Sequence, residues 1–345
     1  MPLIQLYLSL LHRKHACPCV LLLVANQVLT LEMELNLMSS QPTDRSRAST
    51  PEPRGAKSLM IVMSLAIALL FVAAAIPAPI RAAWDEFALR IQLQSEPQSA
   101  SPAKLSDHEI EEIANLPAQQ QAERLLERAI NHYDGALEMI GKSVGNWFGQ
   151  LELQGQLSSL LTTALNSNDL HVRAAALEIE LAGYNLPKRG ESADNLIERI
   201  RREPAARPWA LWMLGVLGNR GVEPRRAFVT LMDHRHDPDE QTRYWVVEGL
   251  AMLGTDETVA PLLEAFRSDP SPLVRERGGC GLAQSGMLTR EQRRRAVPQL
   301  LKMTDDMTLD DATRGWVFQA LRDITGASVA ADSAAWRSWW SQHRS

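Results

Sequence analysis

The sequence predicts an all-α protein whose larger part is an α-solenoid, a stack of similar helix pairs. Helix-forming Ala, Leu, Glu, Arg and Gln are plentiful, whereas aromatic residues make up only 6% of the 345 residues. A second observation is a recurring unit that places an arginine near the start of every second helix. These arginines lie 34, 36, 32 and 39 residues apart, at Arg173, Arg207, Arg243, Arg275 and Arg314.

The first helix of the recurring unit carries a proline near its start. Pro224, Pro261 and Pro298 are spaced by 37 residues, and apolar residues at helical spacing follow each of them. The second helices are expected within 171–184, 206–221, 241–254, 272–286 and 312–326. A two-helix unit with a period of about 30 to 40 residues is typical of a solenoid. We therefore expect about five helix pairs between residues 157 and 328.

These features resemble HEAT repeats in the short form found in bacterial proteins. Besides the first-helix proline, the matching feature is an aspartate that precedes the arginine of the second helix, by four residues in three units and by six in one. The pairs are Asp169 and Arg173, Asp239 and Arg243, Asp269 and Arg275, and Asp310 and Arg314. The resemblance implies that these residues form a ladder that ties neighbouring repeats together.

The C-terminal segment 329–345 also looks like an ending seen on bacterial HEAT proteins, with Asp332 followed by three tryptophans. Asp332 or Ser333 can cap a helix, and Trp336, Trp339 and Trp340 would then lie on one side of it. The last repeat of a solenoid exposes an apolar face that has to be covered. We expect this helix to cover the last pair, near Trp316 and Val317.

Residues 59–76 form an uncharged, almost wholly apolar run that is long enough to span a bilayer. Four basic residues lie between positions 45 and 57, which predicts that the N-terminal side stays in the cytoplasm. The chain is therefore expected in the bacterial inner membrane as a single-pass protein with a periplasmic C-terminal domain. The alternative is a cleaved secretory signal, since Ala73-Ala74-Ala75 fits a cleavage site.

The rest of the N-terminal third divides by composition. Residues 1–58 read as a disordered cytoplasmic tail, and its first 32 or 37 residues would not be translated if the true start is Met33 or Met38. Residues 77–104 form a linker rich in Pro, Ser and Gln. Residues 105–156 are expected to form a helical N-terminal cap that begins with a capping box at Ser106.

Composition and motifs argue against several classes of function. After residue 76 the chain has 30 basic and 37 acidic residues, a net charge of -7 that disfavours binding to nucleic acid. The stretch "DHRHDPDE" at 233–240 contains residue types that often bind metals. If it held a metal ion, the ligands would be His234, His236 and Asp239. We interpret it instead as a capping turn between two helices. The sequence gives no reason to expect a metal or another cofactor.

Together these observations predict an exported, membrane-tethered scaffold without intrinsic catalysis. Stacked repeats leave a long concave face, on which we expect a protein or peptide partner to bind. Two alternatives stay open. One is a lyase-like or other cofactor-handling HEAT protein, and the other is a purely structural periplasmic component of a larger complex.

Overall fold

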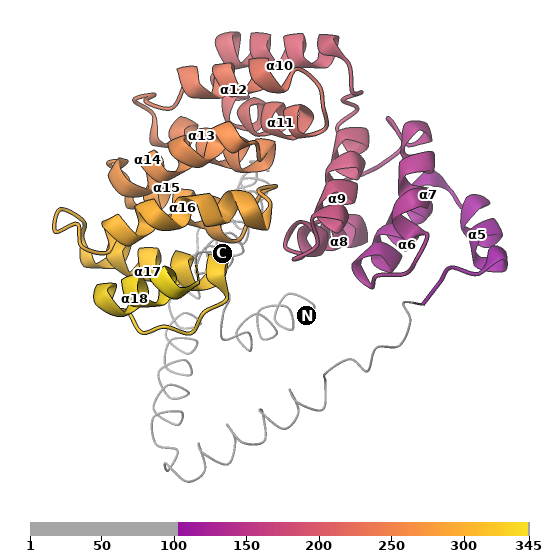
Figure 1. Cartoon of the computed structure of the whole chain (residues 1–345). Helices are drawn as coiled ribbons and strands as arrows, with labels where there is room; N and C mark the ends of the chain where they lie inside the picture. Colours follow the sequence, from indigo (N-terminus) through magenta and orange to yellow (C-terminus); the bar gives the residue numbers. More distant parts are fainter. Residues whose placement is uncertain (1–102, 344–345) are drawn as a thin grey trace, which may run out of the picture. The chain divides into compact units, whose positions relative to one another are not determined.

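The structure is a computed structural model that describes residues 103–343 (Figure 1). These residues contain fourteen α-helices, two short 3-10 helices and no β-strand, so the expected all-helical fold is confirmed. None of these helices is both long and apolar enough to cross a membrane. The predicted cytoplasmic tail, the apolar run 59–76 and nearly all of the linker lie outside the described residues.

The first described helices are α5 (Asp107–Ala114), α6 (Ala118–Ile130) and α7 (Ala136–Ser143), followed by the 3-10 helix η1 (Val144–Asn146). Ser106 caps α5, because its hydroxyl accepts a hydrogen bond from the Glu109 amide at 3.2 Å. The apolar face of α6 is fully buried against α7 and α8 and includes Leu125 and Leu126. The fully buried Trp147 belongs to the same core.

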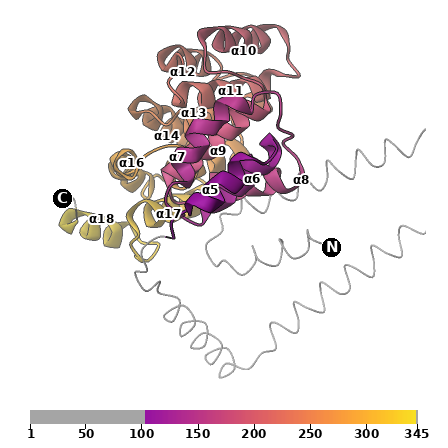
Figure 2. The ribbon, with the colours of Figure 1, turned by 90° about the vertical axis from the view of Figure 1, so that its right-hand side faces the viewer.

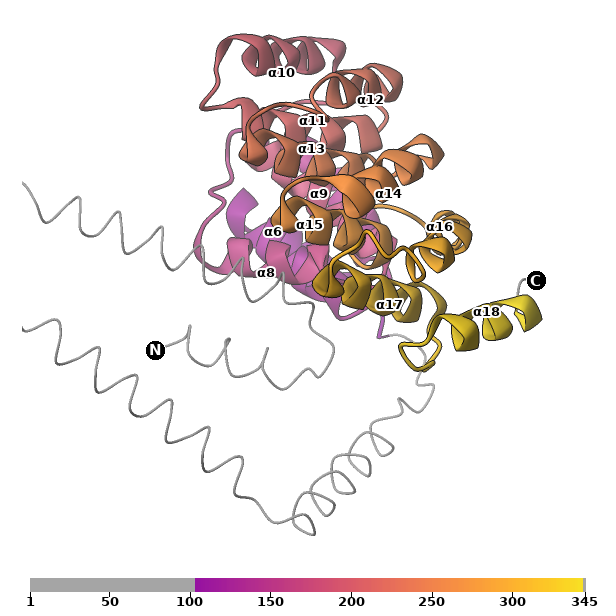
Figure 3. The same cartoon turned by 90° about the vertical axis from the view of Figure 1, so that its left-hand side faces the viewer.

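Five helix pairs follow, and each expected second-helix segment is helical. The pairs are α8 (Gly155–Leu165) with α9 (Leu170–Gly183), α10 (Gly190–Arg202) with α11 (Arg207–Asn219), α12 (Pro224–Asp233) with α13 (Glu240–Leu253), α14 (Val259–Ser268) with α15 (Pro272–Ala283), and α16 (Arg290–Met303) with α17 (Asp311–Thr325). A 3-10 helix, η2 (Asp256–Thr258), leads into α14. The second helices α11, α13, α15 and α17 pack in succession as one layer, and α10, α12, α14 and α16 form the other (Figures 1 and 3).

Close packing within the second-helix layer depends on small residues. A Cβ atom added to Gly215 on α11 would lie only 2.1 Å from the carbonyl oxygen of Gly249 on α13. Any larger residue at this position would force the two helices apart, because protein interiors have almost no spare volume. Gly215 therefore sets the spacing between the second and third pairs.

Helix α9 is shared by two hydrophobic cores. Val172 and Ile179 pack into the N-terminal core, whereas Leu177 and Leu181 pack into the core of the repeats that follow. Arg173 extends this contact, since its guanidinium donates to the carbonyl oxygens of Gln284 at 2.7 Å and Gly286 at 2.6 Å, just after α15. Arg173 thus ties α9 to the segment that follows α15, and in the view of Figure 2 the helices α5 to α9 lie in front of the repeat helices.

The C-terminal helix α18 (Ser333–Gln342) begins at Asp332, whose carboxylate accepts from the Ala335 amide at 2.7 Å. Trp336 is fully buried and shares a core with Val317 of α17. Trp339 and Trp340 are partly buried against the same core. The helix packs beside α16, and the Ser333 hydroxyl donates to the Thr304 carbonyl oxygen at the end of α16, at 3.2 Å.

Candidate functional site

The turns between first and second helices carry a ladder of arginine and aspartate side chains. Arg243 forms a bidentate pair with Asp269 of the next repeat, with Nε–Oδ2 and Nη2–Oδ1 distances of 2.9 and 3.1 Å. Its Nη1 atom also donates to the carbonyl oxygens of Asp237 and Pro238. Hydrogen bonding to Asp269 raises the pKa of Arg243. One repeat further on, Arg275 pairs with Asp310 at 2.9 Å. Each of these two arginines is therefore held by the aspartate of the following repeat.

Two of the predicted ladder arginines have other partners, so the prediction is wrong for them. Arg173 donates to backbone carbonyl oxygens only, because the next turn, at 203–206, contains no aspartate. Arg314 pairs with Asp311 of its own helix at 3.1 Å, because it lies in the last repeat and no later aspartate is available.

The predicted aspartates divide between ladder pairing and capping. Asp239 caps α13 by accepting from the Thr242 amide at 2.7 Å, and the two hydrogen bonds from Thr242 lower its pKa. Asp169 caps α9 and accepts from the His171 amide at 2.8 Å. Asp310 does both, since it accepts from the Thr313 amide as well as from Arg275.

Sequence reasoning missed one step of the ladder. Arg207 approaches Asp237 of the next repeat, with Nη1 and Oδ2 3.7 Å apart. A signal was present, because Asp237 precedes Arg243 by six residues, as Asp269 precedes Arg275. The ladder partner is thus the aspartate six residues before the arginine in these two repeats, and in the first of them Asp239, four residues before Arg243, is the helix cap.

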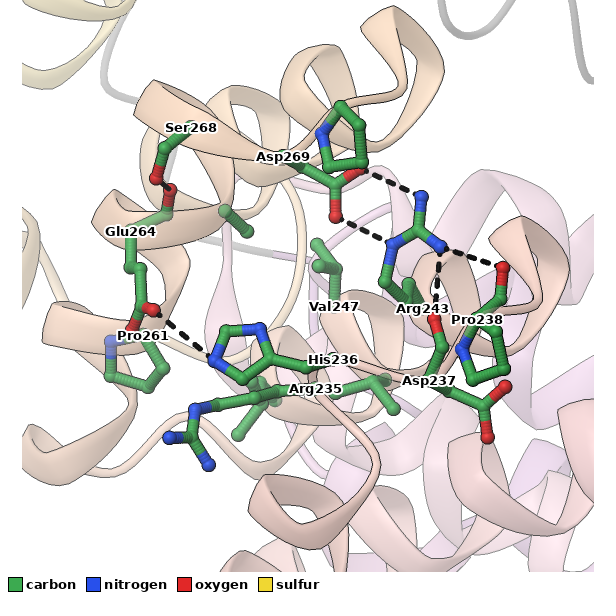
Figure 4. A pocket seen from close by; sticks show the side chains of 14 residues that line it. Arg235, His236, Asp237, Pro238, Arg243, Val247, Pro261, Glu264, Ser268 and Asp269 are labelled. Carbon is green, nitrogen blue, oxygen red and sulfur yellow. Dashed lines mark hydrogen bonds and ion pairs between the residues drawn. The ribbon is translucent and has the colours of Figure 1, made fainter.

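A pocket of about 410 Å³ lies beside the ladder, between the α12–α13 turn and α14 (Figure 4). It is lined by Arg235, His236, Asp237, Pro238, Arg243, Val246, Val247, Leu250, Pro261, Glu264, Ala265, Ser268, Asp269 and Pro270. Val247 and Leu250 are buried and give the pocket an apolar floor. At its mouth the His236 Nε2 atom lies 3.6 Å from Glu264 Oε1.

The two histidines of this turn face different carboxylates. His234 Nδ1 lies 3.5 Å from Asp237 Oδ2, whereas His236 turns to Glu264 on α14. Between residues 103 and 343, no group of three or more His, Cys, Asp or Glu side chains is arranged to hold a metal ion. Cys280 is buried within α15.

A second feature is a set of five aromatic rings at the second helices of three successive repeats, in two contacting groups. We call Tyr184, Trp209, Trp212, Tyr244 and Trp245 the aromatic strip. Its rings meet edge to face, with centroids 5.5 Å apart for Tyr184–Trp209, 6.5 Å for Trp212–Trp245 and 5.6 Å for Tyr244–Trp245. The guanidinium of Arg199 lies over the Trp209 ring, 4.9 Å from its centroid.

Two buried carboxylates lie on α9 close to this strip. Glu178 is neutralised by Lys188 at 2.9 Å and Arg220 at 2.8 Å. Glu180 has a buried Oε2 atom without a hydrogen-bond partner, and burial raises its pKa to about 8. Tyr184 is close enough that Glu180 raises the pKa of its phenol as well, although burial of the ring is the larger cause. Burial therefore favours the protonated, neutral form of Glu180.

The described part of the chain thus consists largely of stacked helix pairs, with a ladder of Arg and Asp side chains along one edge. This arrangement is that of a helical-repeat protein. Residues 193–283, from within α10 to the end of α15, match the family model of HEAT repeats. The match supports the HEAT-repeat resemblance noted in the sequence and confirms it for this segment. No curated protein matches the sequence.

Proposed function

We propose that this chain is a non-catalytic scaffold that binds a protein or peptide partner through its second-helix layer. The aromatic strip is the observation that supports this proposal. Trp, Tyr and Arg are the residues that most often dominate binding energy at protein interfaces. Here four Trp and Tyr rings of α11 and α13, together with Tyr184 and Arg199, form two contacting groups, and all of them are at least partly exposed.

The strip also has the rigidity expected of a binding surface. Trp212 and Trp245 pack partly against the hydrophobic core, which fixes their rings before any partner arrives. Tyr184 is 41% exposed and forms the accessible end of the strip. A rigid, partly exposed aromatic surface loses little side-chain entropy on binding.

Affinity capture with the full-length chain as bait tests this proposal. Arg199→Ala combined with Tyr184→Ala removes the accessible end of the strip and leaves the buried rings in place. The control is Val229→Ala, a change at a residue of α12 that is 45% exposed in the other helix layer. We expect a partner that the wild type and the control retain and the double variant loses, at unchanged melting temperature. A set of captured proteins that is the same for all three baits would refute the proposal.

We propose further that the chain is exported and tethered to the membrane by residues 59–76. The length of this apolar run and the basic residues before it support this topology. A reporter that is active only outside the cytoplasm, fused after Ser345, should be active. Activity of a cytoplasm-only reporter at the same position would contradict the topology. N-terminal sequencing of the mature chain separates a retained anchor from cleavage after Ala75.

A further inference from the structure

We infer that the pocket beside the ladder binds an extended peptide that carries an apolar side chain next to a lysine or arginine. The pocket opens between the α12–α13 turn and α14, and Figure 4 shows Val247 at its centre, between His236 and Arg243. This site uses none of the residues of the aromatic strip, so the inference does not depend on the proposed function.

The floor and walls of the pocket favour an apolar side chain. Val246, Val247 and Leu250 are nearly fully buried beneath it, and Pro261 and Ala265 of α14 form one wall. The volume of about 410 Å³ lies within the usual range for ligand-binding pockets. It is large enough for one branched aliphatic side chain together with the backbone on either side of it.

The surroundings of the pocket favour a basic partner. The turns 233–243, 264–275 and 302–314, which we call the ladder edge, contain ten acidic and six basic residues, a net charge of -4. In the pairs Arg243–Asp269 and Arg275–Asp310 the charges cancel, and Arg235, which also lines the pocket, donates to the Met232 carbonyl oxygen. Glu264, whose side chain is 50% exposed, contacts only His236 through its carboxylate and stands at the mouth of the pocket. Carboxylates of this kind attract a cationic side chain.

The ladder edge also favours an extended conformation of the peptide. A second hollow lies one repeat further on, is lined by Arg275 and Asp310 among others, and shares Ser268 and Asp269 with the first. Packed helices lie about 8 to 10 Å apart. An extended chain advances about 3.3 Å per residue, so about three residues separate side chains that enter neighbouring hollows. A peptide that follows the edge can therefore fill the first pocket and reach the second.

The experiment measures binding of short labelled peptides to the full-length chain by fluorescence polarisation. The probe is a hexapeptide with a central Lys-Leu-Lys, and its counterparts carry Glu-Leu-Glu or Lys-Gly-Lys. In a second measurement photo-leucine replaces the leucine, and mass spectrometry locates the cross-links. The variants are Glu264→Lys, which reverses the charge at the mouth, and Ala265→Leu, which fills the pocket. The control is Glu257→Lys, a charge reversal at an exposed glutamate in η2.

We expect saturable binding of the Lys-Leu-Lys peptide and cross-links to residues 246–250 and 261–265. Glu264→Lys should weaken binding about fivefold or more, because an ion pair becomes a repulsion. Ala265→Leu should abolish it, and Glu257→Lys should leave it unchanged. Equal binding of the Glu-Leu-Glu or Lys-Gly-Lys peptide would overturn the inference. So would cross-links that fall on the aromatic strip, or the absence of saturable binding to a wild-type chain whose thermal melt shows that it is folded.

Discussion

The ladder makes a quantitative prediction about stability, which the variant Arg243→Met tests. The side chains of Arg243 and Asp269 are only 10% and 6% exposed, and Arg243 makes four hydrogen bonds to the two turns it joins. Removing it leaves the Asp269 carboxylate with the Ser271 amide, and two carbonyl oxygens lose a donor. Loss of one partner of a deeply buried pair costs about 3 to 5 kcal/mol. Because these turns lie near the surface, we expect about 2 to 3 kcal/mol.

Urea unfolding followed by circular dichroism measures this loss. The matched control is Arg225→Met, because Arg225 and Glu257 also pair at 2.8 Å, but their side chains are 71% and 52% exposed. That change should cost at most about 0.5 kcal/mol. Arg243→Met combined with Asp269→Asn should cost less than the two single changes together, because the same interaction is lost in both. Equal, small losses for Arg243→Met and Arg225→Met would refute the view that the ladder ties the repeats.

Three further predictions concern other parts of the fold. Burial raises the pKa of Glu180 from 4.5 to about 8. Between these pH values the folded state therefore binds more protons than the unfolded state. The free energy of unfolding should fall as the pH rises through this range, by up to about 1.4 kcal/mol per pH unit. Urea unfolding of Glu180→Gln at several pH values should show no such slope, and an unchanged slope would contradict this reasoning. Trp336→Ala should lower the stability by about 3 to 5 kcal/mol in a thermal melt, because its ring is fully buried. Deletion of residues 331–345 should also lower the melting temperature, and an unchanged value would contradict the view that α18 covers the last helix pair. His234→Ala with His236→Ala should change stability by no more than about 0.5 kcal/mol, and stoichiometric zinc or iron that is lost in this variant would contradict the capping-turn interpretation.

Periodicity was sufficient to predict the helix pairs. The recurring arginine placed all five second helices, because a residue that recurs every 30 to 40 positions marks the same point of each structural unit. Asp332 and the three tryptophans likewise predicted a capped C-terminal helix with a buried ring.

The ladder was harder to predict, because the α12–α13 turn offers two aspartates. Asp239 and Asp237 are both near Arg243 in sequence, and the pattern alone does not tell a helix cap from a partner for the preceding repeat. The structure separates them, since Asp239 binds Thr242 and Asp237 approaches Arg207.

Contacts between distant segments were beyond sequence reasoning. Arg173 and Gly286 are 113 residues apart, and a local pattern carries no information about such a contact. Glu180 also gave no signal, because a glutamate within a helix is usually exposed to solvent, whereas α9 is enclosed by two cores.

The central claim is that a partner binds the aromatic strip on the second-helix layer. Hydrogen–deuterium exchange of the full-length chain, with and without the captured partner, tests it most directly. We predict slower exchange at the starts of α11 and α13, around Trp209 and Trp245, with little change on α12 and α14. Protection confined to the first-helix layer, or no difference between the free and bound chain in α11 and α13, would contradict the claim.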